Sequence, residues 1–136
     1  MRSQLQNKSE ILQDAAKLLH DKTFYPAVAH SAYYSCYQLL KHIWLYGMEK
    51  SQEELNTQSS LSHLGSHEFL INEIGKYIKN SKNRTANSDF RDFNNKIGQL
   101  KTLRTKADYD DDLFDSSKSL NSLSLSDEIV PILKKY

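Results

Sequence analysis

The residues best suited to chemistry lie at the end of a long apolar repeat. Arg104 has a permanently charged guanidinium that can hold a phosphate through paired hydrogen bonds, and Asp108 follows it at helical spacing. Tyr109 comes next, and a phenol is largely un-ionised at pH 7. We treat Arg104, Asp108 and Tyr109 as the candidate catalytic residues. The alternative is that Arg104 only forms an ion pair with Asp108 or another carboxylate, which would stabilise the helix end or a dimer interface.

Other chemical groupings are incomplete. His63 and His67 are four residues apart, which is a ligand-like spacing, but a third ligand is missing nearby and we expect a capping or core role. Cys36 is the only cysteine, so we expect neither an intrachain disulfide nor a cysteine-based zinc site. An acidic run lacks the ligand pattern of a calcium loop and predicts a solvated turn: Asp110, Asp111, Asp112 and Asp115. The sequence predicts no metal and no cofactor.

Positive charge is concentrated in one part of the chain. The 136 residues include 18 Lys and Arg and 17 Asp and Glu, so the net charge of +1 does not favour nucleic acid or an anionic membrane. From Lys76 to Lys106, however, nine Lys and Arg stand against Asp89 and Asp92. This local excess indicates an RNA or nucleotide partner. We find no signal-peptide core and no apolar run that would span a membrane, so we expect a cytoplasmic protein without a membrane contact.

The elements that would position these residues are helices. Apolar residues recur at intervals of three and four, and only four Gly and two Pro interrupt the chain. The length suits one domain over residues 1–136. We expect four main helices, which run from Ser3 to His20, from Phe24 to Tyr46, from Ser66 to Lys79 and from Asp89 to Ala107.

The second of these helices should be the centre of the fold, because it is apolar on most of its circumference. Its small residues would let neighbouring helices approach closely, and its aromatic residues would fill the gaps between them. Gly47 is expected to end this helix in a left-handed conformation. The polar composition from Lys50 to Ser60 then predicts a loop with at most a short helical turn.

The last part of the chain is harder to assign. The segment from Ser116 to Ser126 contains six serines, a composition that disfavours a helix. Pro131 would either kink a longer helix near Asp127 or begin a short one near Val130. Leucines and isoleucines on either side still provide an apolar face that can close a bundle.

Four features together resemble the HEPN family, the higher eukaryote and prokaryote nucleotide-binding domains. Members commonly have a Tyr-Tyr pair in the second helix, a closing Gly, a His that opens the third helix and an Arg-x-x-Ala-Asp-Tyr stretch. The counterparts are Tyr33 and Tyr34, Gly47, His63 or His67, and Arg104 with Ala107, Asp108 and Tyr109. The resemblance implies an up-and-down bundle of four to five helices that usually dimerises. It also implies Tyr33, Tyr34 and Arg104 as ligand-binding residues.

The resemblance does not carry the family's ribonuclease motif. Ribonuclease members have an Arg followed, after four to six intervening residues, by a His, and no Arg and His in this chain have that order and spacing. Tyr109 stands where the His would fall after Arg104. A phenol is a poor general base at neutral pH, so cleavage by the family mechanism is not expected.

Three hypotheses follow. The leading one is a non-catalytic HEPN-like binding or accessory module, a homodimer with a nucleotidyltransferase-type partner or an RNA or nucleotide ligand. The second is a toxin-like, metal-independent ribonuclease with an altered site around Arg104, Asp108 and Tyr109. The third is a structural helical bundle without a ligand.

Overall fold

The computed structural model describes residues 2–136, and every regular element in this part of the chain is a helix. Six α-helices and one π-helix follow one another along the chain. They are α1 (Gln4–Asp21), α2 (Tyr25–His42), the π-helix η1 (Ile43–Gly47), α3 (Gln52–Ser62), α4 (Ser66–Lys79), α5 (Ala86–Tyr109) and α6 (Ser116–Leu133). The expected all-α architecture is confirmed, but the expected number of four to five helices was too low.

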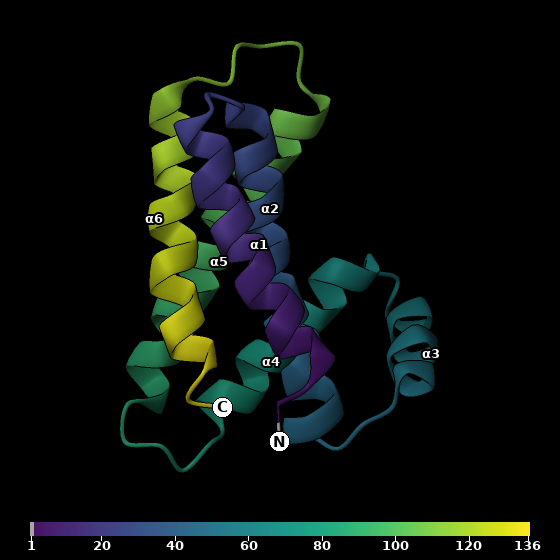
Figure 1. Cartoon of the computed structure of the whole chain (residues 1–136). Coiled ribbons are helices and arrows are strands. Elements are labelled where there is room, and N and C mark those ends of the chain that lie inside the picture. The colour runs from purple at the N-terminus through teal and green to yellow at the C-terminus, as the bar shows by residue number, and fades with distance from the viewer. Residues whose placement is uncertain (1) are drawn as a thin grey trace.

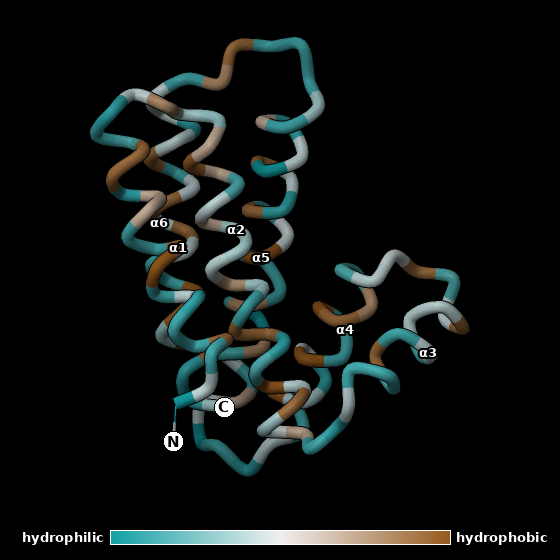
Figure 2. Tube along the Cα trace, turned by 45° about the vertical axis from the view of Figure 1, so that its right-hand side comes forward, coloured by the Kyte–Doolittle hydropathy of each residue, from teal (hydrophilic) through white to brown (hydrophobic). Residues whose placement is uncertain are grey.

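Helix α2 lies at the centre of the bundle. It contacts α1, α4, α5 and α6. Figure 1 shows it alongside α1, and the turned view of Figure 2 shows it between α1 and α5. Ala29, Ala32 and Ser35 are buried and small, so neighbouring helices come close. Tyr33 and Leu40 fill the remaining space. The prediction that this helix is the hub of the fold is therefore confirmed.

The end of the second helix differs from the prediction. The last five residues, Ile43–Gly47, form a π-helix, and Gly47 does not have a left-handed backbone. The left-handed residue is Glu49, with φ of 55°. Gly47 instead contacts the end of the described chain, where a Cβ atom would lie 3.5 Å from the backbone oxygen of Tyr136. This is an ordinary van der Waals distance, so neither a turn nor a close approach requires glycine at position 47.

The segment from Lys50 to Ser60 is mostly helix α3, so the predicted loop was wrong. Ser51 begins the helix with a reciprocal cap. Its hydroxyl accepts a hydrogen bond from the backbone N–H of Glu54, and the Glu54 carboxylate accepts one from the backbone N–H of Ser51. A capping box of this kind starts a helix even in a polar sequence. Leu55 and Ser59, one turn apart, are buried against the rest of the molecule. The cap and these two buried residues outweigh the polar composition on which the loop prediction depended.

Helix α3 projects from the bundle. It packs mainly against α4, and Figures 1 and 2 both show it beside α4 and apart from the long helices. Trp44 of η1 is fully buried and donates its indole N–H to the Ser51 carbonyl at 2.8 Å. The ammonium of Lys50 lies 4.7 Å from the centroid of the same ring. Trp44 thus connects the bundle to the start of α3.

The serine-rich tail is also helical. Helix α6 runs without a break from Ser116 to Leu133, so the predicted restart near Val130 was wrong. Asp115 caps its first turn by accepting from the Lys118 backbone at 3.0 Å. Three of the six serines face the bundle, and two of them, Ser119 and Ser122, are fully buried. Pro131 is exposed and only two helical residues follow it, so the helix loses the backbone hydrogen bond that position 131 would donate but has little length left to disrupt.

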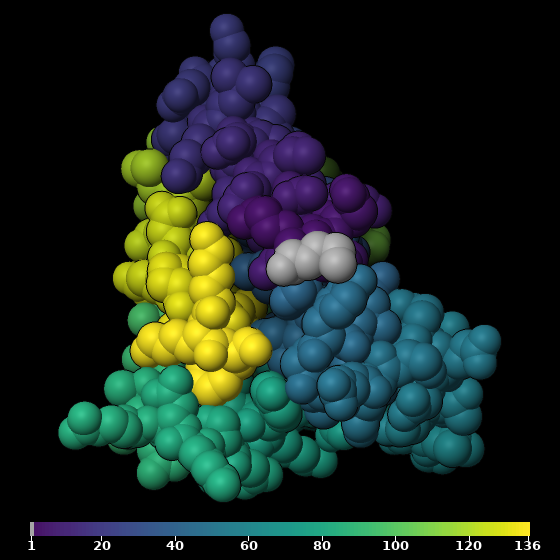
Figure 3. Space-filling view, turned by 60° about the horizontal axis from the view of Figure 1, so that its bottom comes forward, coloured from purple at the N-terminus to yellow at the C-terminus, as the bar shows by residue number. Residues whose placement is uncertain are grey.

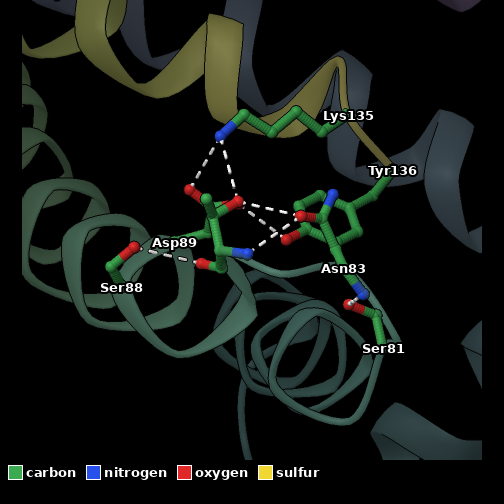
Figure 4. A network of polar contacts seen from close by, with 7 residues as sticks. Ser81, Asn83, Ser88, Asp89, Lys135 and Tyr136 are labelled. Atoms are coloured by element: carbon green, nitrogen blue, oxygen red, sulfur yellow. Dashed lines mark hydrogen bonds and ion pairs between the residues drawn. The ribbon is translucent and has the colours of Figure 1, made fainter.

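The end of α6 is tied to the start of α5 by a buried carboxylate. Asp89 accepts hydrogen bonds from Thr85 Oγ1 at 2.8 Å, from the Tyr136 hydroxyl at 2.7 Å and from Lys135 Nζ at 3.1 Å. Figure 4 shows these side chains converging on Asp89. In Figure 3 the yellow end of the chain lies between the green α4–α5 connection and the blue segment around η1. This network closes the lower end of the bundle.

None of the described helices is both long and apolar enough to cross a membrane.

Candidate ligand site on α2, α4 and α5

Arg104 lies on α5 at the edge of the packed face, as its place in the apolar repeat predicts. Its side chain is 16% exposed, and Nε lies 3.1 Å from Asp108 Oδ2. The predicted ion pair at helical spacing is therefore confirmed. Nη2 donates to the Tyr34 hydroxyl at 3.0 Å. The guanidinium carbon lies 5.6 Å from the ring centroid of Tyr33, 5.4 Å from that of Tyr34 and 5.8 Å from that of Tyr109, within cation–π range.

Most of the hydrogen-bonding capacity of Arg104 is unused. A guanidinium has five N–H donors, and among the described residues only Tyr34 accepts one in good geometry. Nε is buried without an aligned acceptor, although the Asp108 oxygen is close. This combination of a fixed position and free donors suits an oxyanion such as phosphate, two of whose oxygens can accept paired hydrogen bonds.

His30 joins this group from α2. Its Nδ1 lies 3.2 Å from Asp108 Oδ2, the same oxygen that faces Arg104 Nε. The His30 side chain is 51% exposed, and its ring lies 4.8 Å from that of Tyr34. A carboxylate beside one ring nitrogen orients an imidazole and favours a defined tautomer. His30 was not among the residues predicted for the site, although it precedes Tyr34 by one helical turn on the same face.

His67 enters from the first turn of α4. Its Nδ1 lies 2.9 Å from the Tyr33 hydroxyl, and its ring lies 4.1 Å from that of Tyr37. Burial lowers the pKa of His67, and the charges of Arg104 and Lys101 lower it further, so the ring is neutral at pH 7. Burial raises the pKa of the Tyr33 phenol, which therefore keeps its proton and can donate to His67. His67 thus has a core role, one of the two roles expected for it.

An ion pair borders the group on its outer side. Lys101 Nζ lies 2.6 Å from Glu68 Oε2, which links α5 to α4. Glu68 follows His67 in the chain, and Lys101 precedes Arg104 by one turn. A shallow hollow of about 520 Å³ continues outwards from this pair, past Thr105 to Lys106.

The structure brings together all the residues named as candidates from the sequence. Tyr33, Tyr34, Arg104, Asp108 and Tyr109 form one cluster, with Tyr109 at its exposed edge.

The other groups named from the sequence lie outside this cluster. His63 is the left-handed residue that ends α3, with φ of 61°, and does not share a helix face with His67. The acidic run lies in the connection from α5 to α6. Within residues 2–136 no cluster of three or more His, Cys, Asp or Glu could hold a metal ion.

The basic stretch from Lys76 to Lys106 is only partly neutralised. Four of its nine cations have a carboxylate partner: Lys76, Lys96, Lys101 and Arg104. The other five form no ion pair within the part of the chain that the structure describes: Lys79, Lys82, Arg84, Arg91 and Lys106. Most of the positive excess therefore remains available at the surface.

This geometry allows two kinds of chemistry. The guanidinium and the aromatic rings can bind a phosphate and a neighbouring planar base. The imidazole of His30, held beside Asp108, is a candidate proton acceptor or donor. Comparison with family models, with curated proteins and with solved structures found no match to this chain.

Proposed function

We propose that this chain is a non-catalytic, HEPN-like binding module that acts as a homodimer and holds an RNA or nucleotide ligand at Arg104. The tyrosine pair Tyr33 and Tyr34 would form the aromatic part of the site. The resemblance to the family also implies an accessory role beside a nucleotidyltransferase-type protein.

The observation that carries this proposal is the state of Arg104. Its guanidinium is held by Asp108 and by the hydroxyl of Tyr34, and it lies against three aromatic rings. An arginine that served only in an ion pair would not need three aromatic rings around its guanidinium, and its remaining N–H donors would be satisfied within the fold. Here they are free to meet a phosphate, with the unpaired Lys106 two residues further along α5; the other four unpaired cations lie toward the start of that helix.

Binding measurements with defined probes test the proposal. A fluorescein-labelled ten-nucleotide oligoadenylate and a fluorescent ATP analogue are titrated with the purified chain, and the dissociation constant is followed by anisotropy at fixed salt. Arg104→Gln should weaken binding about tenfold or more, because charge-assisted hydrogen bonds to phosphate are lost. The matched control is Arg91→Gln, because Arg91 is an exposed arginine on the same helix without an ion pair. This substitution should change the dissociation constant less than threefold.

Equal effects of the two substitutions would place the ligand elsewhere on the basic stretch. Absence of binding by both probes at low salt would remove the binding proposal and leave the ligand-free structural bundle.

One observation favours a second candidate, a ribonuclease with an altered site. His30, oriented by Asp108, stands where it can take the proton of an RNA 2′-hydroxyl. That oxygen would attack the adjacent phosphorus while the bond to the 5′-oxygen breaks and that oxygen takes up a proton from water, which leaves a 2′,3′-cyclic phosphate with Arg104 beside its negative charge. The predicted result is metal-independent cleavage of a labelled RNA in EDTA that His30→Asn abolishes while His20→Asn does not. Intact RNA after prolonged incubation with excess protein would exclude this candidate.

A further inference from the structure

The end of α3 exposes two large apolar side chains. Leu61 is 73% exposed, and Leu64, in the turn to α4, is 43% exposed. The helix that carries Leu61 has 11 residues, and isolated helices of that length are marginal in water. It is held to the bundle mainly through α4, with Leu55 as its buried apolar contact. An additional partner would therefore stabilise this projecting helix.

An apolar hollow opens directly beside these leucines. It measures about 320 Å³ and lies where the α3–α4 turn meets α4 and α5. Leu64, Phe69 and Phe90 line its apolar part. Gly75 keeps it open, because a Cβ atom there would lie 3.3 Å from the Phe90 ring and displace it. Asn72 lies among the polar residues that line the same hollow.

Charges near the two features are complementary. Glu54 precedes Leu61 by seven residues, so both lie on one face of α3, about 10 Å apart along its axis. Glu53 and Glu54 are exposed and form no ion pair with another described residue. On the side of the hollow, Lys79 follows Gly75 by one turn of α4, and its Nζ lies 5.3 Å from the Phe90 ring centroid.

We infer that the hollow receives α3 of a second copy of this chain. Leu61 of each copy fills the hollow of the other, and Glu53 and Glu54 face Lys79 and the exposed Lys82 beyond it. The protruding leucine and the hollow lie next to each other on one copy, so a twofold axis between two copies satisfies both at once. The inference rests on the homodimer of the proposed function and assigns its interface.

Sedimentation velocity of the full chain over a range of concentrations tests this interface. The native chain should dimerise, and Leu61→Glu should raise the dimer dissociation constant about 100-fold, since two buried leucines are lost per dimer and each is worth about tenfold. The matched control is Leu113→Glu, which changes an equally exposed leucine in the α5–α6 connection, far along the chain from the hollow. It should leave the constant unchanged, and circular dichroism should show both variants folded.

Cross-linking between two differently tagged chains gives an independent measurement. One chain carries Leu61→Cys and the other Asn72→Cys, and the native Cys36 is fully buried and does not compete. Under mild oxidation the mixture should yield a covalent heterodimer, while neither chain alone should form a covalent dimer in comparable yield.

The outcomes separate this inference from the proposed function. A native dimer that survives Leu61→Glu and gives no mixed cross-link overturns the interface and leaves the homodimer standing. If the native chain stays monomeric at a protein concentration 100-fold above its dissociation constant for the nucleotide, both the interface and the homodimer are overturned. Binding of oligoadenylate by such a monomer would still support the ligand site at Arg104.

Discussion

Replacing Asp89 by alanine should destabilise the fold without touching the candidate site. Asp89 is 4% exposed and accepts from Thr85, Lys135 and Tyr136, which connect the start of α5 with the end of α6. The substitution removes the common acceptor of all three contacts. Arg104 and its tyrosines lie at the opposite end of α5, about 22 Å away along the helix axis.

The size of the effect follows from the partners. A hydrogen bond to a charged group contributes about 1.5–3 kcal/mol when buried. Thr85 and Lys135 are exposed, however, so water replaces Asp89 for them after the substitution, and their contributions fall to about 0.5–1 kcal/mol each. The Tyr136 bond, at 2.7 Å, is the shortest of the three. The free energy of unfolding should therefore fall by about 2.5–5 kcal/mol.

Urea unfolding followed by circular dichroism at pH 7 measures this change. With a slope of about 2 kcal/mol per molar urea, the midpoint should fall by about 1–2.5 M while the slope stays constant. Asp92→Ala is the control, because Asp92 is an exposed carboxylate on the same helix and should shift unfolding by no more than about 0.5 kcal/mol. If the two variants have the same midpoint, the Asp89 network contributes nothing and the reasoning is refuted.

The pH dependence gives a second test of the same group. Burial raises the pKa of Asp89, but hydrogen bonds from Tyr136, Thr85 and Lys135 outweigh it, and the net pKa lies below its ordinary value of 3.8. The unfolded chain therefore binds a proton before the folded chain does. The contribution of Asp89 is fully present above pH 4–5 and is lost as the pH falls through its folded pKa. Asp89→Asn should abolish this part of the acid sensitivity.

Four other substitutions have defined outcomes. Gly98→Ala should raise the free energy of unfolding by about 0.5–1 kcal/mol, because the added Cβ meets nothing within 4 Å. Gly75→Ala should give no such gain, because its Cβ would lie 3.3 Å from the Phe90 ring. Equal gains for the two variants in urea unfolding would refute this distinction. The folded-state pKa of His67 is lowered, so stability should fall as the pH drops below 6.5, and a His67→Gln variant with the same loss between pH 7.5 and 5.5 would contradict that assignment. Ser122→Val should cost about 1–3 kcal/mol by overpacking a fully buried position, and an unchanged melting temperature would show that α6 has space there.

The helices that were located well from the sequence are those with both an apolar repeat and a clear end. The range from Ser66 to Lys79 is confirmed as α4, although Gly65 rather than Ser66 is the residue before its first turn. The ion pair between Arg104 and Asp108 was also predictable, because helical spacing alone brings the two side chains together.

The errors have physical causes that composition does not reveal. Helix α3 depends on one capping box and on Leu55, which compensate for its polar remainder. In α6, buried serine hydroxyls bond to carbonyls of the same helix, as Ser122 does to Lys118, so serine is tolerated inside the bundle. The first helix begins and ends within one residue of the prediction, because Ser3 provides an explicit cap.

The candidate site was only half accessible from the sequence. Tyr33, Tyr34 and Arg104 were named through a resemblance, and their convergence is observed in the structure. His30 and His67 were not assigned to the site, because only packing of α2 and α4 against α5 brings them there. The family assignment and the function stay predictions.

Trp44 makes the projecting helix observable without labels. It is the only tryptophan in the chain, and its indole is buried at the point where the bundle meets the start of α3. Detachment of α3 would break the bond to Ser51 and admit water, shifting the fluorescence emission to longer wavelength. Intrinsic fluorescence in a denaturant titration would then distinguish release of this helix from unfolding of the bundle, which circular dichroism follows.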